Sequence, residues 1–282
     1  MPTQRFPVLD PATIVDTREA LHAYATILGN WRFSCLARRK HWWHLGIKPS
    51  IRGLTTGLIQ SGIDFELELD LSGDRLLGSV SGGATLSEPL AGRPAAELAQ
   101  RVEEFLLDSG IDHKLVPDDD PPARHFKPTP GYSAQIAGSL SDAFSSVSAS
   151  LSTFRAGIRE ETSPIHIWPH HFDLALMWLP GEKVPGQDTK DEEVSDKQMN
   201  FGFTLGDAGI SEPYFYITAY PLPEQFPDLN LPTGARWHTE GFSGIVLPYH
   251  TLHEKPEAGD FLLRLWNTAL SAGRQHMLTN NS

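Results

Sequence analysis

The chain has 282 residues, with 40% hydrophobic and 21% charged residues, a formal net charge of −12 and one cysteine. This composition is that of a globular protein and excludes a largely disordered chain. The acidic balance disfavours nucleic acid as a partner, and the single Cys35 excludes an internal disulfide or a cysteine-based metal site. No apolar run is long enough for a signal peptide or a membrane span, so we expect a cytoplasmic protein without a membrane partner.

The N-terminal region is predicted to be an extended arm, residues 1–15, followed by a helix that begins at Asp16. Asp16 as N-cap and Glu19 three positions later have the spacing of a capping box. Apolar residues then recur at spacings of three and four and give the helix one apolar face: Leu21, Tyr24, Ala25, Leu28, Trp31 and Cys35. The helix is expected to end at the basic residues 38–40.

The rest of the first half, residues 16–116, is predicted to contain strands and then a second helix. The aromatic segment 41–45 favours the start of a strand. Strict alternation of apolar and acidic residues over 65–71 predicts a half-exposed strand, which a turn joins to a second strand. A helix is expected from Pro94 to about Gly110. Five prolines and three consecutive aspartates then mark residues 117–131 as a linker.

The second half, residues 132–282, repeats this order. An apolar stripe predicts a helix over about 139–159, and a final helix is expected over about 256–272. Between them lie several predicted strands and a charged loop at 182–198. We therefore predict an α+β fold of two similar helix–strands–helix halves, with mostly antiparallel sheets and helices packed on one face.

Matching His-x-Trp segments suggest that the halves arose by internal duplication. His41 and His166 are separated by the same interval as Trp43 and Trp168, and the leading helices align at nearly that offset. A chance resemblance between two α+β halves is the alternative. The spacing predicts either two related strand starts or two parts of one site.

The first functional hypothesis is a small-molecule-binding protein or enzyme with a pocket between the halves, lined by histidine and tryptophan. His41 and His166 are the candidate catalytic residues, because the repeated His-x-Trp could bring their two imidazoles to one pseudo-symmetric pocket. Tryptophan rings beside imidazoles suit a flat or cationic ligand, Arg52 would supply positive charge for an anionic group, and Tyr216 is a further hydroxyl donor. The candidate ligand-binding residues are therefore Trp43, His44, Arg52, Trp168 and Tyr216. Core packing explains the tryptophans equally well.

Two alternatives remain open. One is a metal-dependent enzyme in which His166, His170 and Asp173 bind a divalent ion that activates water, although Pro164 and Pro169 argue against a helix that would align these ligands. No other cofactor is expected, because neither a Walker sequence nor a dinucleotide fingerprint occurs. The other alternative is a non-catalytic interaction or scaffold protein, and a homo-oligomer is compatible with either reading.

Four segments carry a resemblance to a known family: HWWHLGIKPSIRGLTTG, SPIHIWPHHFDLALMW, NFGFTLGDAGISEPYFYITAYP and GIVLPY. Over nearly its whole length the chain resembles a bacterial family known only as a domain of unknown function. The most specific motifs are HWWH followed by RGLTT, and FDLA followed by EPYFY. The resemblance implies no activity, substrate, cofactor or catalytic residue, so the function has to be argued from the residues.

Overall fold

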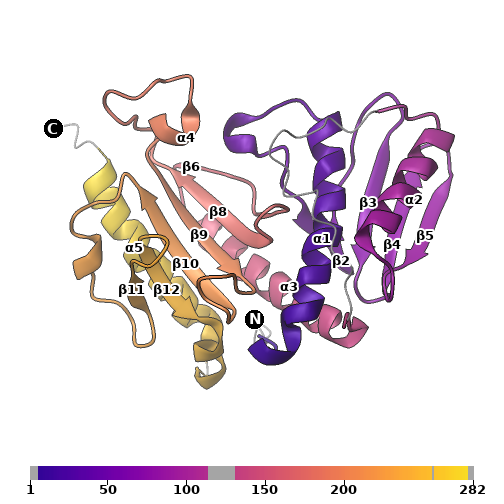
Figure 1. Ribbon diagram of the computed structural model, residues 1–282. Coiled ribbons are helices and arrows are strands. Elements are labelled where there is room, and N and C mark those ends of the chain that lie inside the picture. Colours follow the sequence, from indigo (N-terminus) through magenta and orange to yellow (C-terminus); the bar gives the residue numbers. More distant parts are fainter. Residues whose placement is uncertain (1–5, 114–130, 256, 279–282) are drawn as a thin grey trace. The chain divides into compact units, whose positions relative to one another are not determined.

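The computed structural model describes residues 6–113, 131–255 and 257–278, and these residues form an α+β protein (Figure 1). Contacts within the chain divide it into two compact units. We call residues 9–145 and 166–172 the N-terminal unit, and residues 1–8, 146–165 and 173–282 the C-terminal unit. The predicted linker at 117–131 lies almost entirely outside the described residues.

The N-terminal unit contains an antiparallel sheet in which the strands follow one another in chain order. These are β1 (Lys48–Pro49), β2 (Gly53–Thr55), β3 (Phe65–Asp70), β4 (Arg75–Val80) and β5 (Thr85–Pro89). In β3, Phe65, Leu67 and Leu69 are buried, as their alternation with acidic residues predicts. The tight turn that joins β3 to β4 is also as expected.

Two helices pack on this sheet (Figure 1): α1 (Pro11–Cys35) contacts β3, and α2 (Ala95–Asp108) contacts β5. The prediction that α1 begins at Asp16 was wrong. The carboxylate of Asp10 accepts a hydrogen bond from the backbone N–H of Ala12 at 3.0 Å and caps the helix. Pro11, at the first helical position, has no N–H that needs a partner and has a φ that suits a helix. Residues 11–15, which were predicted to belong to an extended arm, are therefore helical.

The sheet of the C-terminal unit is antiparallel in the order β11–β12–β10–β9–β8–β6. In chain order these strands are β6 (Glu161–Thr162), β8 (Asp173–Leu179), β9 (Gln198–Thr204), β10 (Tyr214–Tyr220), β11 (Arg236–His238) and β12 (Gly244–Pro248). The final helix α5 (Ala258–Met277) packs against β9 and β10 (Figure 1). The charged loop holds the short helix α4 (Glu192–Ser195).

The long helix α3 (Ala134–Ala156) contributes residues to both units and begins a few residues before the predicted start. The predicted α+β class with antiparallel sheets is confirmed, whereas an internal duplication is not shown. No helix among the described residues has the length and apolar composition needed to cross a membrane.

A hydrogen bond between half-buried Tyr216 and buried Asp173 explains why β9 of the C-terminal sheet has a glycine at position 202. Tyr216 lies opposite Gly202 in the pairing of β10 with β9. The Tyr216 hydroxyl donates a hydrogen bond to the carboxylate of Asp173, which is buried on β8. A Cβ added at Gly202 would lie 2.1 Å from Cζ of the Tyr216 ring. Glycine is therefore required there for the ring to reach the carboxylate.

We predict that Gly202→Ala lowers the free energy of unfolding by about 1–3 kcal/mol, because the added methyl group overpacks the Tyr216 ring. Urea denaturation followed by circular dichroism measures this change. Gly138→Ala is the matched control: a Cβ at Gly138 in α3 meets no atom within 4 Å, so this change should stabilise the protein by about 0.5–1 kcal/mol. Equal effects of the two changes would contradict the argument.

Candidate functional site

The two His-x-Trp segments lie side by side in the N-terminal unit. The second segment forms the strand β7 (His166–Trp168), as predicted. The backbones of Ile47 and Ile167 form an antiparallel bridge, with hydrogen bonds of 3.0 Å from Ile47 N–H and 2.8 Å from Ile167 N–H. Residues that are far apart in the chain are therefore adjacent around this bridge.

Helix α1 holds the second segment in place. The imidazole of His22 donates from Nε2 to the carbonyl oxygen of His170 at 3.2 Å, and its ring stacks on Phe172 with 5.5 Å between centroids. A Cβ added at Gly29 would lie 2.6 Å from the Pro169 ring. The helix and the segment therefore pack in direct contact, which leaves β7 little freedom to move.

The first segment is a tight turn, so the prediction of a strand at 41–44 was wrong. Residues Lys40–Trp42 form the 3₁₀ turn η1, in which His41 has φ 48° and Trp42 has φ 57°. Residues other than glycine rarely adopt this left-handed conformation. It costs about 1–3 kcal/mol per residue and persists only where the surrounding structure imposes it. Such strain is frequent at functional sites, where it orients side chains.

The turn arranges its four rings in two alternating stacks. The rings of His41 and Trp43 stack at 6.1 Å between centroids, and those of Trp42 and His44 at 5.7 Å. The guanidinium of Arg38 lies 4.6 Å from the centroid of the Trp42 ring. Both histidines are buried and both tryptophans are half-buried, so aromatic surface remains accessible beside the imidazoles.

His166 is the most deeply buried histidine of the cluster, with 2% of its surface exposed. Its ring lies against Gly46, where an added Cβ would come within 2.4 Å of the ring carbon Cγ. The edge of Trp168 packs on the same ring at 4.4 Å between centroids. The nitrogen Nε2 of His166 is buried and has no hydrogen-bond partner among the described residues.

Burial and nearby cations keep this imidazole neutral. Burial lowers the pKa of His166 to about 3, and the positive charges of Arg32 and Lys48 add to the effect. The ring at neutral pH therefore has one N–H donor and one acceptor nitrogen. Such a ring is suited to hydrogen bonding, whereas a pKa this far from neutrality makes it a poor general base.

Arg32 is the buried cation of the site, and sequence reasoning missed it. It lies on α1 at 8% exposure and donates from Nε to the carbonyl oxygen of His44 at 2.9 Å and from Nη1 to that of Thr56. Burial lowers its pKa to about 10, with a further effect of Arg39, so the group stays charged at neutral pH. No carboxylate among the described residues forms an ion pair with it.

His44 is a second neutral imidazole next to the same cations. Burial lowers its pKa, and the charges of Arg32, Arg38 and Arg39 lower it further. The backbone N–H of Arg39 donates to Nδ1 of His44 at 3.3 Å, so Nε2 carries the proton in the neutral ring. Residues 20–63, which supply most of this cluster, contain six Lys or Arg and no Asp or Glu, although the whole chain is acidic.

The other two candidate ligand-binding residues are not part of this cluster. The guanidinium of Arg52 is half-exposed and pairs with Glu68, with Asp70 at 3.7 Å, so carboxylates already balance its charge. Tyr216 belongs to the C-terminal unit, where its hydroxyl is bound to Asp173. The structure thus groups His41, Trp43, His44, His166 and Trp168 in one unit, together with the unpredicted Arg32.

The alternative metal set gains no support from the structure. Among the residues that the structure describes, no group of three or more His, Cys, Asp or Glu is arranged to hold a metal ion. His170 packs against Trp168 and His171, with ring centroids 5.7 and 4.4 Å away. Asp173 accepts the hydrogen bond of Tyr216 in the C-terminal unit.

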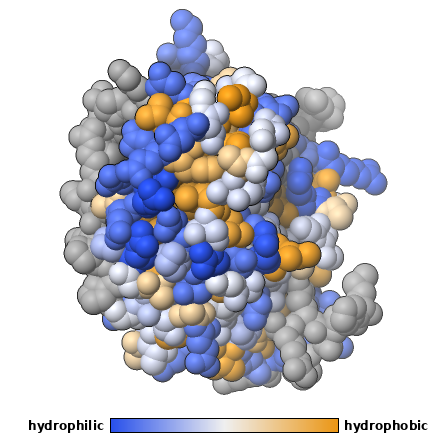
Figure 2. Space-filling view, turned by 90° about the vertical axis from the view of Figure 1, so that its right-hand side faces the viewer, coloured by the Kyte–Doolittle hydropathy of each residue, from blue (hydrophilic) through white to orange (hydrophobic). Residues whose placement is uncertain are grey.

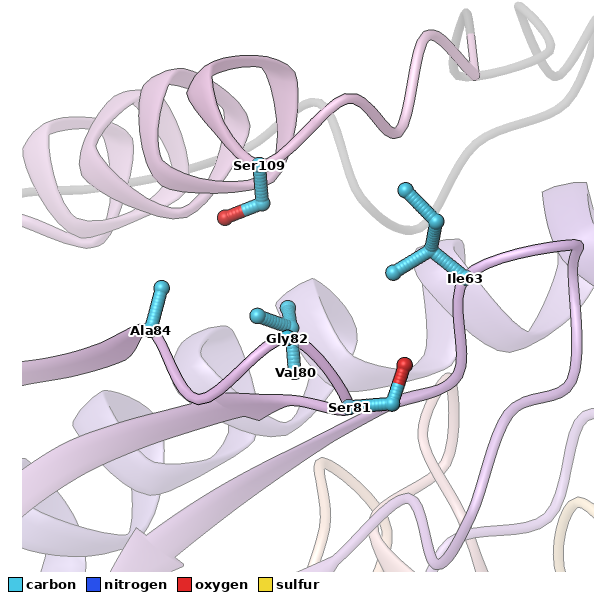
Figure 3. Close-up of a pocket in the computed structure, with 6 residues that line it drawn as sticks. All are labelled: Ile63, Val80, Ser81, Gly82, Ala84 and Ser109. Atoms are coloured by element: carbon cyan, nitrogen blue, oxygen red, sulfur yellow. The ribbon is translucent and has the colours of Figure 1, made fainter.

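A shallow pocket of about 370 Å³ occurs elsewhere in the N-terminal unit, where the end of α2 faces the turn between β4 and β5 (Figure 3). Apolar side chains and two serine hydroxyls line it: Ile63, Val80, Ser81, Gly82, Ala84 and Ser109. Figure 2 looks onto the side of this unit where α2 and β5 lie and shows apolar residues gathered among hydrophilic ones. None of the candidate residues lines this pocket, and none of its lining residues is ionisable.

The model of a family described as "Family of unknown function (DUF5996)" matches residues 6–279 of the chain. Comparison with curated proteins and with solved structures gives no match. The match covers nearly the whole chain and confirms the resemblance inferred from its motifs.

The neutral state of buried His166 predicts how stability depends on pH. Between pH 6.5 and about 3 the unfolded imidazole binds a proton that the folded one does not. The free energy of unfolding should therefore fall as pH falls below 6.5, by up to about 1.4 kcal/mol per pH unit from this residue. In urea denaturation at pH 5–8, the free energy of unfolding of His166→Gln should fall less steeply with pH than that of the wild type, by this amount. His276→Gln, which removes an exposed ring of α5, should keep the wild-type slope. Identical slopes for all three proteins would contradict the assignment.

Proposed function

The chain belongs to this family of unknown function, and we propose that it is a small-molecule-binding protein whose ligand forms a hydrogen bond with His166. The observation that carries the proposal is the buried Nε2 atom of His166, which lacks a partner among the described residues. Leaving such a group unsatisfied costs about 1–3 kcal/mol, so native proteins rarely do so without a reason. A ligand atom at this position would satisfy it.

The residues around His166 support a ligand more than simple core packing. The indole nitrogen of Trp43 is a second buried polar atom without a described partner. Indole nitrogens of the same kind occur in the C-terminal unit at Trp178 and Trp266, so this atom alone would mean little. The indole nitrogen of Trp43 supports a ligand because Trp43 directly follows Trp42 in the strained turn.

The accessible aromatic surfaces favour a ligand with a flat body. Trp43 and Trp168 are half-buried, and each packs against an imidazole of the cluster, His41 and His166 respectively. Tryptophan rings offer large rigid surfaces that stack on planar groups at little cost in conformational entropy. A planar ligand therefore fits the side chains on this side of the N-terminal unit.

Binding accounts for His166 better than proton transfer does. A general base works best with a pKa near the working pH, whereas the pKa of His166 is lowered to about 3. In this proposal His166 orients the ligand by a hydrogen bond, and if the protein is an enzyme its proton-transferring group is a different one, with His41 as the candidate.

The proposal predicts that a ligand changes the Nε2 resonance of His166. Protein labelled with ¹⁵N-histidine is titrated with a panel of small planar acids, amides and amines and followed by long-range ¹H–¹⁵N correlation spectra. We expect at least one compound to shift the His166 signal in a saturable way, because a new hydrogen bond alters the nitrogen directly. His166→Gln identifies the signal and should weaken binding of that compound by roughly tenfold.

His238→Asn is the control, since His238 is a half-buried ring of the C-terminal unit and already has the carbonyl oxygen of Glu240 as a partner. This variant should retain binding. If no compound in the panel moves the His166 signal, the proposal fails, and the interpretation as an interaction or scaffold protein is favoured instead.

A further inference from the structure

We propose that the ligand carries a carboxylate group and that Arg32 binds this group. This inference rests on the proposed function, because it assigns the chemical class of the ligand at the same site. It starts from the charge of the site rather than from the unpartnered atom of His166. Arg32 is buried and charged, and no described carboxylate balances it. An unpaired charge in such a position is unfavourable, and an anionic partner offsets this cost.

The guanidinium has donors left for a ligand. Its five N–H bonds form a planar fork, and two of its nitrogens, Nε and Nη1, donate to the carbonyl oxygens of His44 and Thr56. These two bonds fix the orientation of the side chain. Three N–H bonds on Nη1 and Nη2 have no acceptor among the described residues, and they are enough for the two oxygens of a carboxylate.

The surroundings of Arg32 are positively charged. The charged groups that act on the imidazole of His166 are Arg32 and Lys48, and those that act on His44 are Arg32, Arg38 and Arg39. No acidic side chain is among them. An anion entering the site therefore meets several cations at once, and the field of these cations selects against cationic ligands.

A carboxylate fits this site better than a phosphate dianion. Phosphate sites are commonly built at the N-terminus of a helix, where free N–H groups point at the ligand. Arg32 lies in the last turn of α1, which ends at Cys35, and the C-terminal end of a helix carries partial negative charge. Arg32 balances the single negative charge of a carboxylate, whereas the second negative charge of a phosphate dianion would be repelled by the C-terminal end of α1.

Benzoate and benzamide test the inference, because they have the same planar body and differ in charge. Binding is measured by isothermal titration calorimetry and by the His166 signal of ¹⁵N-histidine-labelled protein. We expect benzoate to bind at least about tenfold more tightly than benzamide, as a charge-assisted hydrogen bond would give. Inorganic phosphate should not compete with benzoate at the same concentration.

Variants separate the role of Arg32 from the general charge of the site. Arg32→Gln should abolish the preference for benzoate over benzamide. Because this change removes a buried residue, its fold is checked by circular dichroism, and Lys48→Met provides a second test at an exposed position. Lys48→Met should weaken benzoate binding about two- to threefold and leave benzamide binding unchanged. Arg155→Gln, in the C-terminal unit, is the control and should change neither affinity.

The outcomes distinguish this inference from the proposed function. If benzamide shifts the His166 signal as strongly as benzoate, the site binds small molecules but the carboxylate assignment is overturned. If phosphate displaces benzoate, or if benzoate fails to bind while neutral compounds of the panel do, the assignment is also overturned. If no compound shifts the signal, both proposals fail.

Discussion

Two backbone hydrogen bonds between Ile47 and Ile167 are the interaction on which the candidate site depends. They place β7 beside the turn at residues 41–44, and they bring the ring of His166 against Gly46. Burial then lowers the pKa of His166 and leaves its Nε2 atom without a described partner. The chemistry of the site is thus a consequence of one non-local pairing of backbone, to which helix α1 adds the buried charge of Arg32.

The regular elements could be predicted because their periodicity is local. The alternation at 65–71 and the stripes of α2 and α3 depend only on which face of each element is buried. The turn at His41–Trp42 could not be predicted in this way, because the preference of tryptophan for strands is weak and tertiary contacts override it. The pairing of Ile47 with Ile167 could not be predicted either, since no local sequence pattern specifies which distant segment a strand pairs with.

Arg32, unlike the Ile47–Ile167 pairing, has a local signal in the sequence. It lies four residues after Leu28 and seven after Ala25, so it occupies the apolar face of α1 beside Trp31. A charged residue on a buried helix face indicates a compensating interaction, because the cost of removing its charge from water must be offset by a partner. Arg52 was chosen instead to supply fixed positive charge for an anionic group, but its charge is balanced by Glu68.

The low pKa of His166 also determines whether the protonation state of the site changes with pH. From slightly acidic to mildly alkaline pH the imidazole of His166 keeps the same single proton, and Arg32 keeps its charge because its pKa, although lowered, is about 10. The polar groups that face a ligand therefore present one unchanging pattern of donors and acceptors. A carboxylate ligand also stays ionised over this range, so neither Arg32, His166 nor such a ligand would make binding depend on pH there.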